Sequence, residues 1–127
     1  MKLNADHGKI ILRISLSLVF LWFGINQLIS PADWLGFVPA VFLGVITAKT
    51  LIFINASFEI IFGLLLICGL YVRIAALILG LHLLGISFSL GYSALAVRDF
   101  GLSLATIAIC FFGEDKICVD YLYQKKV

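Results

Sequence analysis

Four apolar runs, each long enough to cross a lipid bilayer, constrain this chain more than any other feature of its sequence. The runs cover residues 10–29, 49–70, 73–92 and 95–113, and a spanning helix needs roughly 20 mostly apolar residues. None of them alternates polar and apolar residues as a barrel strand does, and backbone groups in lipid must be satisfied within their own segment. We therefore predict one all-α transmembrane domain over residues 1–127, a four-helix bundle.

The composition excludes several other classes of protein. Of the 127 residues, 63% are hydrophobic and only 13% are charged, whereas about a quarter of an ordinary soluble domain is charged. The three cysteines are irregularly spaced and form no disulfide framework or zinc motif, so no metal is predicted. The net charge of +2 is scattered among apolar runs, which excludes the continuous basic patch that nucleic-acid binding needs.

A shorter apolar stretch, residues 35–46, lies between the first and second runs. It has about a dozen residues and contains Pro39, which makes it too short to span a bilayer. Trp34, beside Asp33, stands at its edge, as expected for a ring at headgroup level. The stretch is therefore predicted to be interfacial or re-entrant, with an ordinary external loop as the alternative.

The basic residues predict the topology. If the four helices alternate in direction, most basic residues fall on one side of the membrane and two fall on the other. The positive-inside rule then places both termini in the cytoplasm, with a plasma (inner) membrane as the expected location. The first run lacks an A-x-A cleavage site, so we expect a retained helix. The larger set is Lys2, Lys9, Arg13, Arg73, Lys116, Lys125 and Lys126, and the smaller set is Lys49 and Arg98.

Two ionisable residues fall near the middle of predicted helices. Glu59 and His82 each lie about ten residues from a helix end, or roughly 15 Å deep. An ionisable side chain at that depth is costly unless it is paired or hydrated, so it marks a functional site by default. We take both as candidate catalytic residues. The alternative is a structural role, in which they hydrogen-bond across the bundle and fix helix register.

Small and polar residues recur at steps of three and four along each helix, which places them on one face. Such faces are expected to turn inward, because lipid offers polar groups no partner. The members are Arg13, Ser17, Phe20, Gly24 and Gln27 on the first helix, Asn55, Glu59 and Gly63 on the second, Ala75, Ile78, His82, Gly85, Ser89 and Tyr92 on the third, and Asp99, Ser103, Thr106, Cys110 and Gly113 on the fourth.

Other polar residues concentrate in the predicted external half of the bundle. The sequence thus predicts a cup with a polar mouth and with Glu59 and His82 at its floor. Such a cup would hold a small amphipathic molecule or pass protons. Because neighbours on a helix do not face each other, Arg98 and Asp99 are expected to find partners elsewhere. The candidate ligand-binding residues are Asn26, Gln27, Asn55, Arg98 and Asp99.

Five segments resemble the DoxX-like family of four-helix membrane proteins. They are Arg13 with FGINQ at 23–27, EIIFG at 59–63, GLYVR at 69–73, RDFGL at 98–102 and the tail GEDKICVD at 113–120. Two departures stand out: the family usually has lysine where Gln27 stands, so a charge is lost there, and Cys118-Val119 replaces Ser-Leu before the final aspartate.

The resemblance implies a membrane protein linked to quinone-dependent oxidation of sulfur compounds or to membrane oxidoreductase assemblies. Our leading hypothesis is a redox-associated subunit that binds a quinone-like or other small amphipathic molecule in the cup. It would be a non-catalytic or ligand-binding subunit of a quinone-linked oxidoreductase, while a partner subunit supplies the electron chemistry. The expected partners are the bilayer and either other subunits of a membrane redox complex or further copies of the chain. The alternatives are a small proton-coupled transporter and a structural or assembly subunit. Fold alone does not decide among them.

Overall fold

The computed structural model describes residues 4–127 and contains four helices long and apolar enough to cross a membrane. These are α1 (Ala5–Ile29), α2 (Ala48–Cys68), α3 (Val72–Ser89) and α4 (Ala94–Phe112), and a short α5 (Val119–Gln124) follows them. No strand occurs within residues 4–127, so the predicted all-α fold is confirmed. Lys2, which entered the topology prediction, lies outside the described residues.

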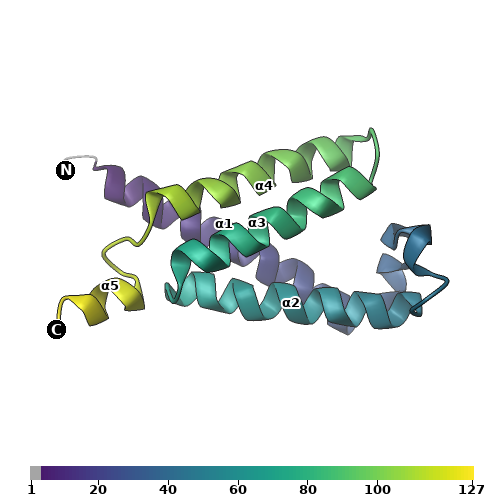
Figure 1. Ribbon diagram of the computed structural model, residues 1–127, viewed down its shortest axis with the longest axis horizontal. Helices are drawn as coiled ribbons and strands as arrows, with labels where there is room; N and C mark the ends of the chain where they lie inside the picture. The colour runs from purple at the N-terminus through teal and green to yellow at the C-terminus, as the bar shows by residue number, and fades with distance from the viewer. Residues whose placement is uncertain (1–3) are drawn as a thin grey trace.

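The helices form two antiparallel hairpins. α1 packs along α2, α3 packs along α4, and the hairpins meet through α2 with α3 and α1 with α4. Figure 1 shows both termini at one end of the bundle, together with the α2–α3 turn and α5. The α1–α2 connection and the α3–α4 turn lie at the other end. We call these the terminal end and the loop end.

Local signals set the helix boundaries. α1 begins at Ala5 rather than at residue 10, because the side chain of Asn4 caps it by accepting from the Asp6 amide. α2 starts after Thr47, whose hydroxyl accepts from the Thr50 amide. α3 stops at Ser89 rather than at residue 92, since Gly91 turns the chain with a φ of +67° before Ser93 caps α4.

The connection between α1 and α2 is not one of the four membrane-capable helices. It contains two 3₁₀ helices, η1 (Pro31–Phe37) and η2 (Ala40–Phe42), and η1 contacts both α1 and α2. Trp34 holds this segment to the bundle, with its ring edge-on to Phe23 at 5.5 Å between centroids. Its predicted location at the membrane interface stays a prediction.

The turn between α2 and α3 holds the tail of the chain. Gly69 ends α2 with a φ of +75°, and the Leu70 amide donates to the Leu65 carbonyl over 2.8 Å. The Asp120 amide donates to the Gly69 carbonyl over 3.1 Å, which holds the start of α5 against the turn. A Cβ on Gly69 would lie 2.5 Å from Cα of Cys118, so the close approach of the tail requires glycine.

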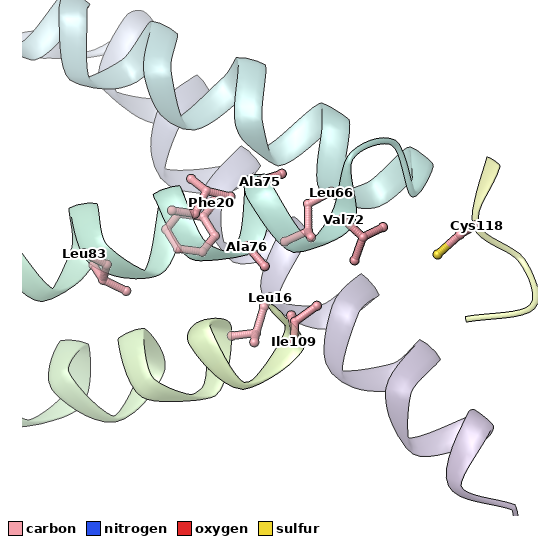
Figure 2. Packing of buried hydrophobic residues seen from close by; sticks show 10 residues of the cluster. Leu16, Phe20, Leu66, Val72, Ala75, Ala76, Leu83, Ile109 and Cys118 are labelled. Atoms are coloured by element: carbon pink, nitrogen blue, oxygen red, sulfur yellow. The ribbon is translucent and has the colours of Figure 1, made fainter. Parts of the chain in front are cut away.

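The apolar core lies toward the terminal end of the bundle (Figure 2). Apolar residues from α1, α3 and the ends of α2 and α4 meet there, with Cys118 from the tail. Toward the loop end, the polar residues described below contact one another between the helices. The fully buried members are Leu16, Phe20, Leu66, Val72, Ala75, Ala76, Leu79, Leu83, Ile109 and Cys118.

The predicted inward faces agree with the structure on three helices. Every residue named on α1 is buried, and so are Glu59 and Gly63 on α2 and all but Cys110 of those on α4. The predicted face of α3 agrees only in its first half: Ala75 is buried and His82 is half-buried, whereas Gly85, Ser89 and Tyr92 are exposed. α3 is rotated so that Gly80 and Ser87 face α4: Ser87 Oγ donates to the Ala96 carbonyl over 2.8 Å.

Candidate functional site

A chain of side-chain hydrogen bonds connects three helices in the half of the bundle toward the loop end. His82 Nε2 lies 2.7 Å from Asn55 Oδ1, Asn55 Nδ2 donates to Gln27 Oε1 over 2.8 Å, and Gln27 Nε2 donates to Glu59 Oε2 over 3.3 Å. Gln27 comes from α1, Asn55 and Glu59 from α2, and His82 from α3. We call these four residues the polar cluster. The structure thus brings both candidate catalytic residues together with two of the candidate ligand-binding residues.

Glu59 differs in its surroundings from the other buried acids. Glu59 is only 4% exposed, and its carboxylate accepts a hydrogen bond from a neutral side-chain amide, that of Gln27. Asp99 and Asp115, also buried, each pair with an arginine. Among residues 4–127, none of the ion pairs includes Glu59. A buried carboxylate held only by amides is costly, which makes this position the most unusual one in the bundle.

His82 is held in one orientation by α2. Its ring lies against the ring of Phe58, with 4.4 Å between centroids and 39° between planes. Asn55, one turn earlier on the same helix face, contacts Nε2. Because Oδ1 of Asn55 is a carbonyl oxygen and accepts only, Nε2 of His82 is the donor. The proton on the neutral ring is therefore on Nε2, and Nδ1 carries the lone pair.

Arg98 and Asp99 pair with each other, contrary to the sequence prediction. Nε of Arg98 donates to Oδ1 of Asp99 over 2.9 Å, and its Nη2 lies at the same distance from that oxygen. The long arginine side chain folds back near the start of α4, which brings consecutive residues together. Arg98 also lies over the ring of Phe23 on α1, 5.7 Å from its centroid.

Asn26 does not join the polar cluster. Its Nδ2 donates to the Trp22 carbonyl on its own helix over 2.8 Å, and it faces away from Gln27.

The predicted cup, with Glu59 and His82 at its floor, stays a prediction. Two surface hollows, of about 370 and 400 Å³, lie at opposite ends of the bundle. The first is lined by residues around the α3–α4 turn, among them Ser87, Tyr92 and Phe100. The second lies between the α2–α3 turn and α5. Gln27, Asn55, Glu59 and His82 line neither hollow, because these side chains contact one another across the bundle.

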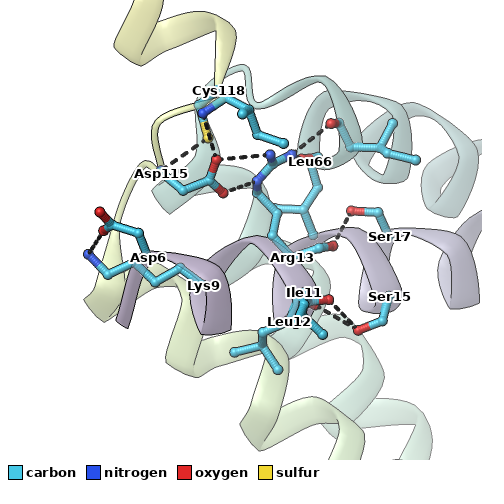
Figure 3. Close-up of polar contacts among 12 residues, drawn as sticks. Asp6, Lys9, Ile11, Leu12, Arg13, Ser15, Ser17, Leu66, Asp115 and Cys118 are labelled. Carbon is cyan, nitrogen blue, oxygen red and sulfur yellow. Dashed lines mark hydrogen bonds and ion pairs between the residues drawn. The ribbon is translucent and has the colours of Figure 1, made fainter. Parts of the chain in front are cut away.

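A second polar site lies at the terminal end, and sequence reasoning missed it. Arg13, which is 1% exposed, donates from Nε to Oδ2 of Asp115 over 2.6 Å and from Nη2 to Oδ1 over 3.2 Å (Figure 3). Its Nη1 donates to the carbonyls of Leu66 and Ile67, over 2.8 and 2.7 Å. These carbonyls belong to the last turn of α2, where the Leu66 carbonyl also accepts from the Gly69 amide over 3.2 Å. Arg13 therefore joins α1, α2 and the tail.

The sequence carried one signal of this role. Arg13 was counted as a topology marker, yet it occupies the same helix face as Ser17 and Gln27, both buried. An arginine on an inward face needs an acid opposite it. Asp115 is that acid, because the tail that carries it returns to the end of the bundle where Arg13 lies.

The surroundings of Asp115 favour its ionised form. Burial by itself raises the pKa of Asp115, but the hydrogen bonds and charge of Arg13 outweigh it and hold the pKa below the ordinary value of 3.8. The Ile117 amide also donates to Oδ1, over 3.1 Å. Burial raises the pKa of the neighbouring Cys118 thiol to about 11, so this cysteine stays protonated near neutral pH.

Comparison with known proteins places these features in a family. The DoxX family model matches residues 8–91. The chain belongs to the DoxX family. Neither the search of curated proteins nor the search of solved structures gave a match. The part that matches the DoxX model contains Arg13 and the whole polar cluster, whereas Arg98, Asp99 and Asp115 lie beyond it. No group of three or more His, Cys, Asp or Glu side chains that could hold a metal occurs in the described part of this DoxX protein.

Proposed function

We propose that this DoxX protein is a redox-associated membrane subunit that binds a quinone-like or other small amphipathic molecule at the polar cluster. The observation that carries the proposal is Glu59, a buried carboxylate without a basic partner among the described residues, joined through two amides to His82. A carboxylate without a basic partner is energetically costly within a membrane, and a functional role of Glu59 explains that cost most directly.

The surroundings of the cluster suit a ring-shaped, apolar ligand with polar ends. Phe58 and Phe62 lie tilted against each other with 4.7 Å between centroids, and Phe58 contacts the ring of His82. An apolar ring would pack against such a surface, while Glu59 and His82 would orient its polar atoms by hydrogen bonds or exchange protons with them. In this proposal a partner subunit supplies the electron chemistry.

The membrane orientation belongs to the same proposal. Lys9, Arg73, Lys116, Lys125 and Lys126 lie at the terminal end, and Lys49 and Arg98 lie at the loop end. The positive-inside rule then supports a plasma-membrane protein with both termini in the cytoplasm and the polar cluster in the outer half of the bilayer.

The test is ligand binding by purified protein in lipid nanodiscs. A decyl-substituted benzoquinone is a suitable probe, and Glu59→Gln is the decisive variant because it keeps the shape and removes the charge. We expect the variant to bind at least about tenfold more weakly, the value of one or two lost hydrogen bonds to a charged group. Asn26→Ala, which removes a neighbouring polar side chain outside the cluster, is the matched control. Equal binding by wild type and the Glu59 variant removes Glu59 from the site.

A structural role is the second candidate, because the four cluster side chains satisfy one another across three helices. Such a network locks helix register without any ligand. If the role is structural, replacing Glu59 and His82 together should lower the melting temperature and leave partner assembly and growth phenotypes unchanged.

The third candidate, proton-coupled transport, is favoured by the same unpaired carboxylate. Substrate-driven proton movement in liposomes would support it, and its loss in Glu59→Gln would assign the proton to this residue.

A further inference from the structure

We propose that the hollow between the α2–α3 turn and α5 binds the head group of a membrane phospholipid whose amine carries N–H donors, a head group of the ethanolamine type. The hollow has a volume of about 400 Å³ and lies at the terminal end of the bundle, away from the polar cluster (Figure 1). This lipid site is therefore separate from the ligand site proposed at the polar cluster. The lining residues are Leu70 and Tyr71 of the turn and Val119, Asp120, Tyr123 and Gln124 of α5.

The position of the hollow matches the depth of lipid head groups. The turn that forms one wall joins two membrane-capable helices, and α5, the other wall, follows soon after α4 ends at Phe112. Tyr71 and Tyr123 line the hollow, and both side chains are exposed. Tyrosines gather at membrane–water interfaces, because the ring is apolar while the hydroxyl is hydrated. A phospholipid head group is therefore the molecule best placed to enter the hollow from the bilayer.

The lining of the hollow suits a cation. The carboxylate of Asp120 belongs to it, and none of the ion pairs within residues 4–127 includes this residue. The side-chain oxygen of Gln124 and the two tyrosine hydroxyls are further acceptors. An ammonium group brings three N–H donors to such a set, and its charge is attracted to aromatic faces as well. Of the described residues, no lysine or arginine lines the hollow, so an anionic group alone finds no opposite charge there.

Two lysines beside the hollow offer the opposite charge to the phosphate of the same lipid. Lys125 and Lys126 directly follow α5, and both are exposed. Neither takes part in an ion pair within the described chain, whereas Lys9 and Lys116 both lie against Asp6. Lysine binds phosphate as a flexible point charge. Both charges of a zwitterionic phospholipid thus find an opposite charge at this end of the protein.

The backbone of Tyr71 gives an independent observation. Its φ is +49°, and it is the one non-glycine residue within residues 4–127 that has a positive φ. A bulky residue rarely adopts this left-handed conformation, whereas glycine adopts it freely. Strained residues of this kind cluster at ligand-binding sites. The turn thus carries an aromatic ring where glycine would relieve the strain, and packing of this ring on a lipid head group accounts for it.

Lipid retention by the purified protein tests the proposal. The protein is reconstituted in an equal mixture of phosphatidylethanolamine, phosphatidylcholine and phosphatidylglycerol with the same acyl chains, then extracted in detergent, and native mass spectrometry identifies the lipids that stay bound. We expect the ethanolamine lipid to be retained at least about tenfold over the choline lipid, whose methylated amine has no N–H, the value of one hydrogen bond to a charged group. Equal retention of these two, or preferential retention of the anionic glycerol lipid, overturns the proposal.

Three variants separate lipid recognition from folding. Asp120→Asn keeps the shape of the side chain and removes its charge, so the preference for the ethanolamine lipid should fall about tenfold. Glu114→Gln removes an acid at the same end that does not line the hollow, and this control should leave the preference unchanged. Tyr71→Gly removes the ring and relieves the backbone, so lipid retention should fall while the melting temperature in lipid-free detergent stays the same or rises. An unchanged preference in Asp120→Asn overturns the proposal, whatever Tyr71→Gly does.

Discussion

Arg13 and Asp115, separated by 102 positions in the chain, form a doubly hydrogen-bonded ion pair that is almost completely buried. The pair connects the first helix to the segment that follows the last membrane helix, and Arg13 also binds two carbonyls at the end of α2. The pair therefore holds the two hairpins together at the terminal end of the bundle. The position of the polar cluster, toward the loop end, depends on this arrangement of the hairpins.

Removing one member of this pair should strongly destabilise the protein. Arg13→Met leaves the Asp115 carboxylate buried without its ion-pair partner and removes the side-chain hydrogen bonds to the Leu66 and Ile67 carbonyls, at a cost of about 3–5 kcal/mol. The measurement is thermal unfolding in detergent or nanodiscs. Arg73→Met is the matched control: Arg73 is 55% exposed, lies 4.0 Å from Glu114 and donates to the Cys110 carbonyl over 3.1 Å at the surface, so its loss should change stability by less than about 1 kcal/mol. Similar melting temperatures for the two variants would contradict the role of Arg13.

Acid should weaken the protein through Asp115. Its pKa in the folded state is below the ordinary value of 3.8, so its contribution to stability is fully present above that value. The contribution is lost as the pH falls through the folded-state pKa, because the unfolded chain then binds the proton first. Melting temperatures between pH 3 and 7 measure this. Asp115→Asn should be less stable at pH 7 and should show a flatter decline in acid; an unchanged slope would assign the acid sensitivity to other groups.

Two glycines of α3 test the rotation of this helix. A Cβ on Gly80 would collide with Ile107 of α4 and approach the Ser103 carbonyl to 3.1 Å, whereas nothing lies within 4 Å of one on Gly85. Gly80→Ala should therefore cost about 1–3 kcal/mol. Gly85→Ala should be neutral or stabilise by about 0.5–1 kcal/mol, because alanine favours helix. The reverse order of melting temperatures would restore the face predicted from sequence, on which Gly85 turns inward.

The proposed orientation predicts opposite labelling at the two ends of the bundle. In a protein whose native cysteines are replaced by alanine, Val127→Cys should react with an impermeant maleimide only after the cells are opened. Gly44→Cys, in the exposed connection between η2 and α2, should react in intact cells. Both sites are solvent-accessible, so each serves as the control for the other. Labelling of Val127→Cys in intact cells would reverse the topology.

Sequence patterns predicted the parts of this protein that depend on single helices. Run length and apolarity fix the four membrane-capable helices, because in lipid each must satisfy its own backbone. Periodicity identified the buried faces of α1 and α4, and the depth of Glu59 and His82 marked them as candidates that now meet in one hydrogen-bonded cluster.

Only the tertiary structure decided what depends on how the helices meet. The rotation of α3 follows from close packing of Gly80 on α4, a contact between helices that no period within α3 contains. The pairing of Arg13 with Asp115 joins opposite ends of the chain, and the direction of the hydrogen bonds from His82 to Glu59 requires side chains from three helices at once. The sequence of a single helix shows which of its residues are polar. The partner of each polar atom, however, depends on the neighbouring side chains that packing brings within about 3 Å of it.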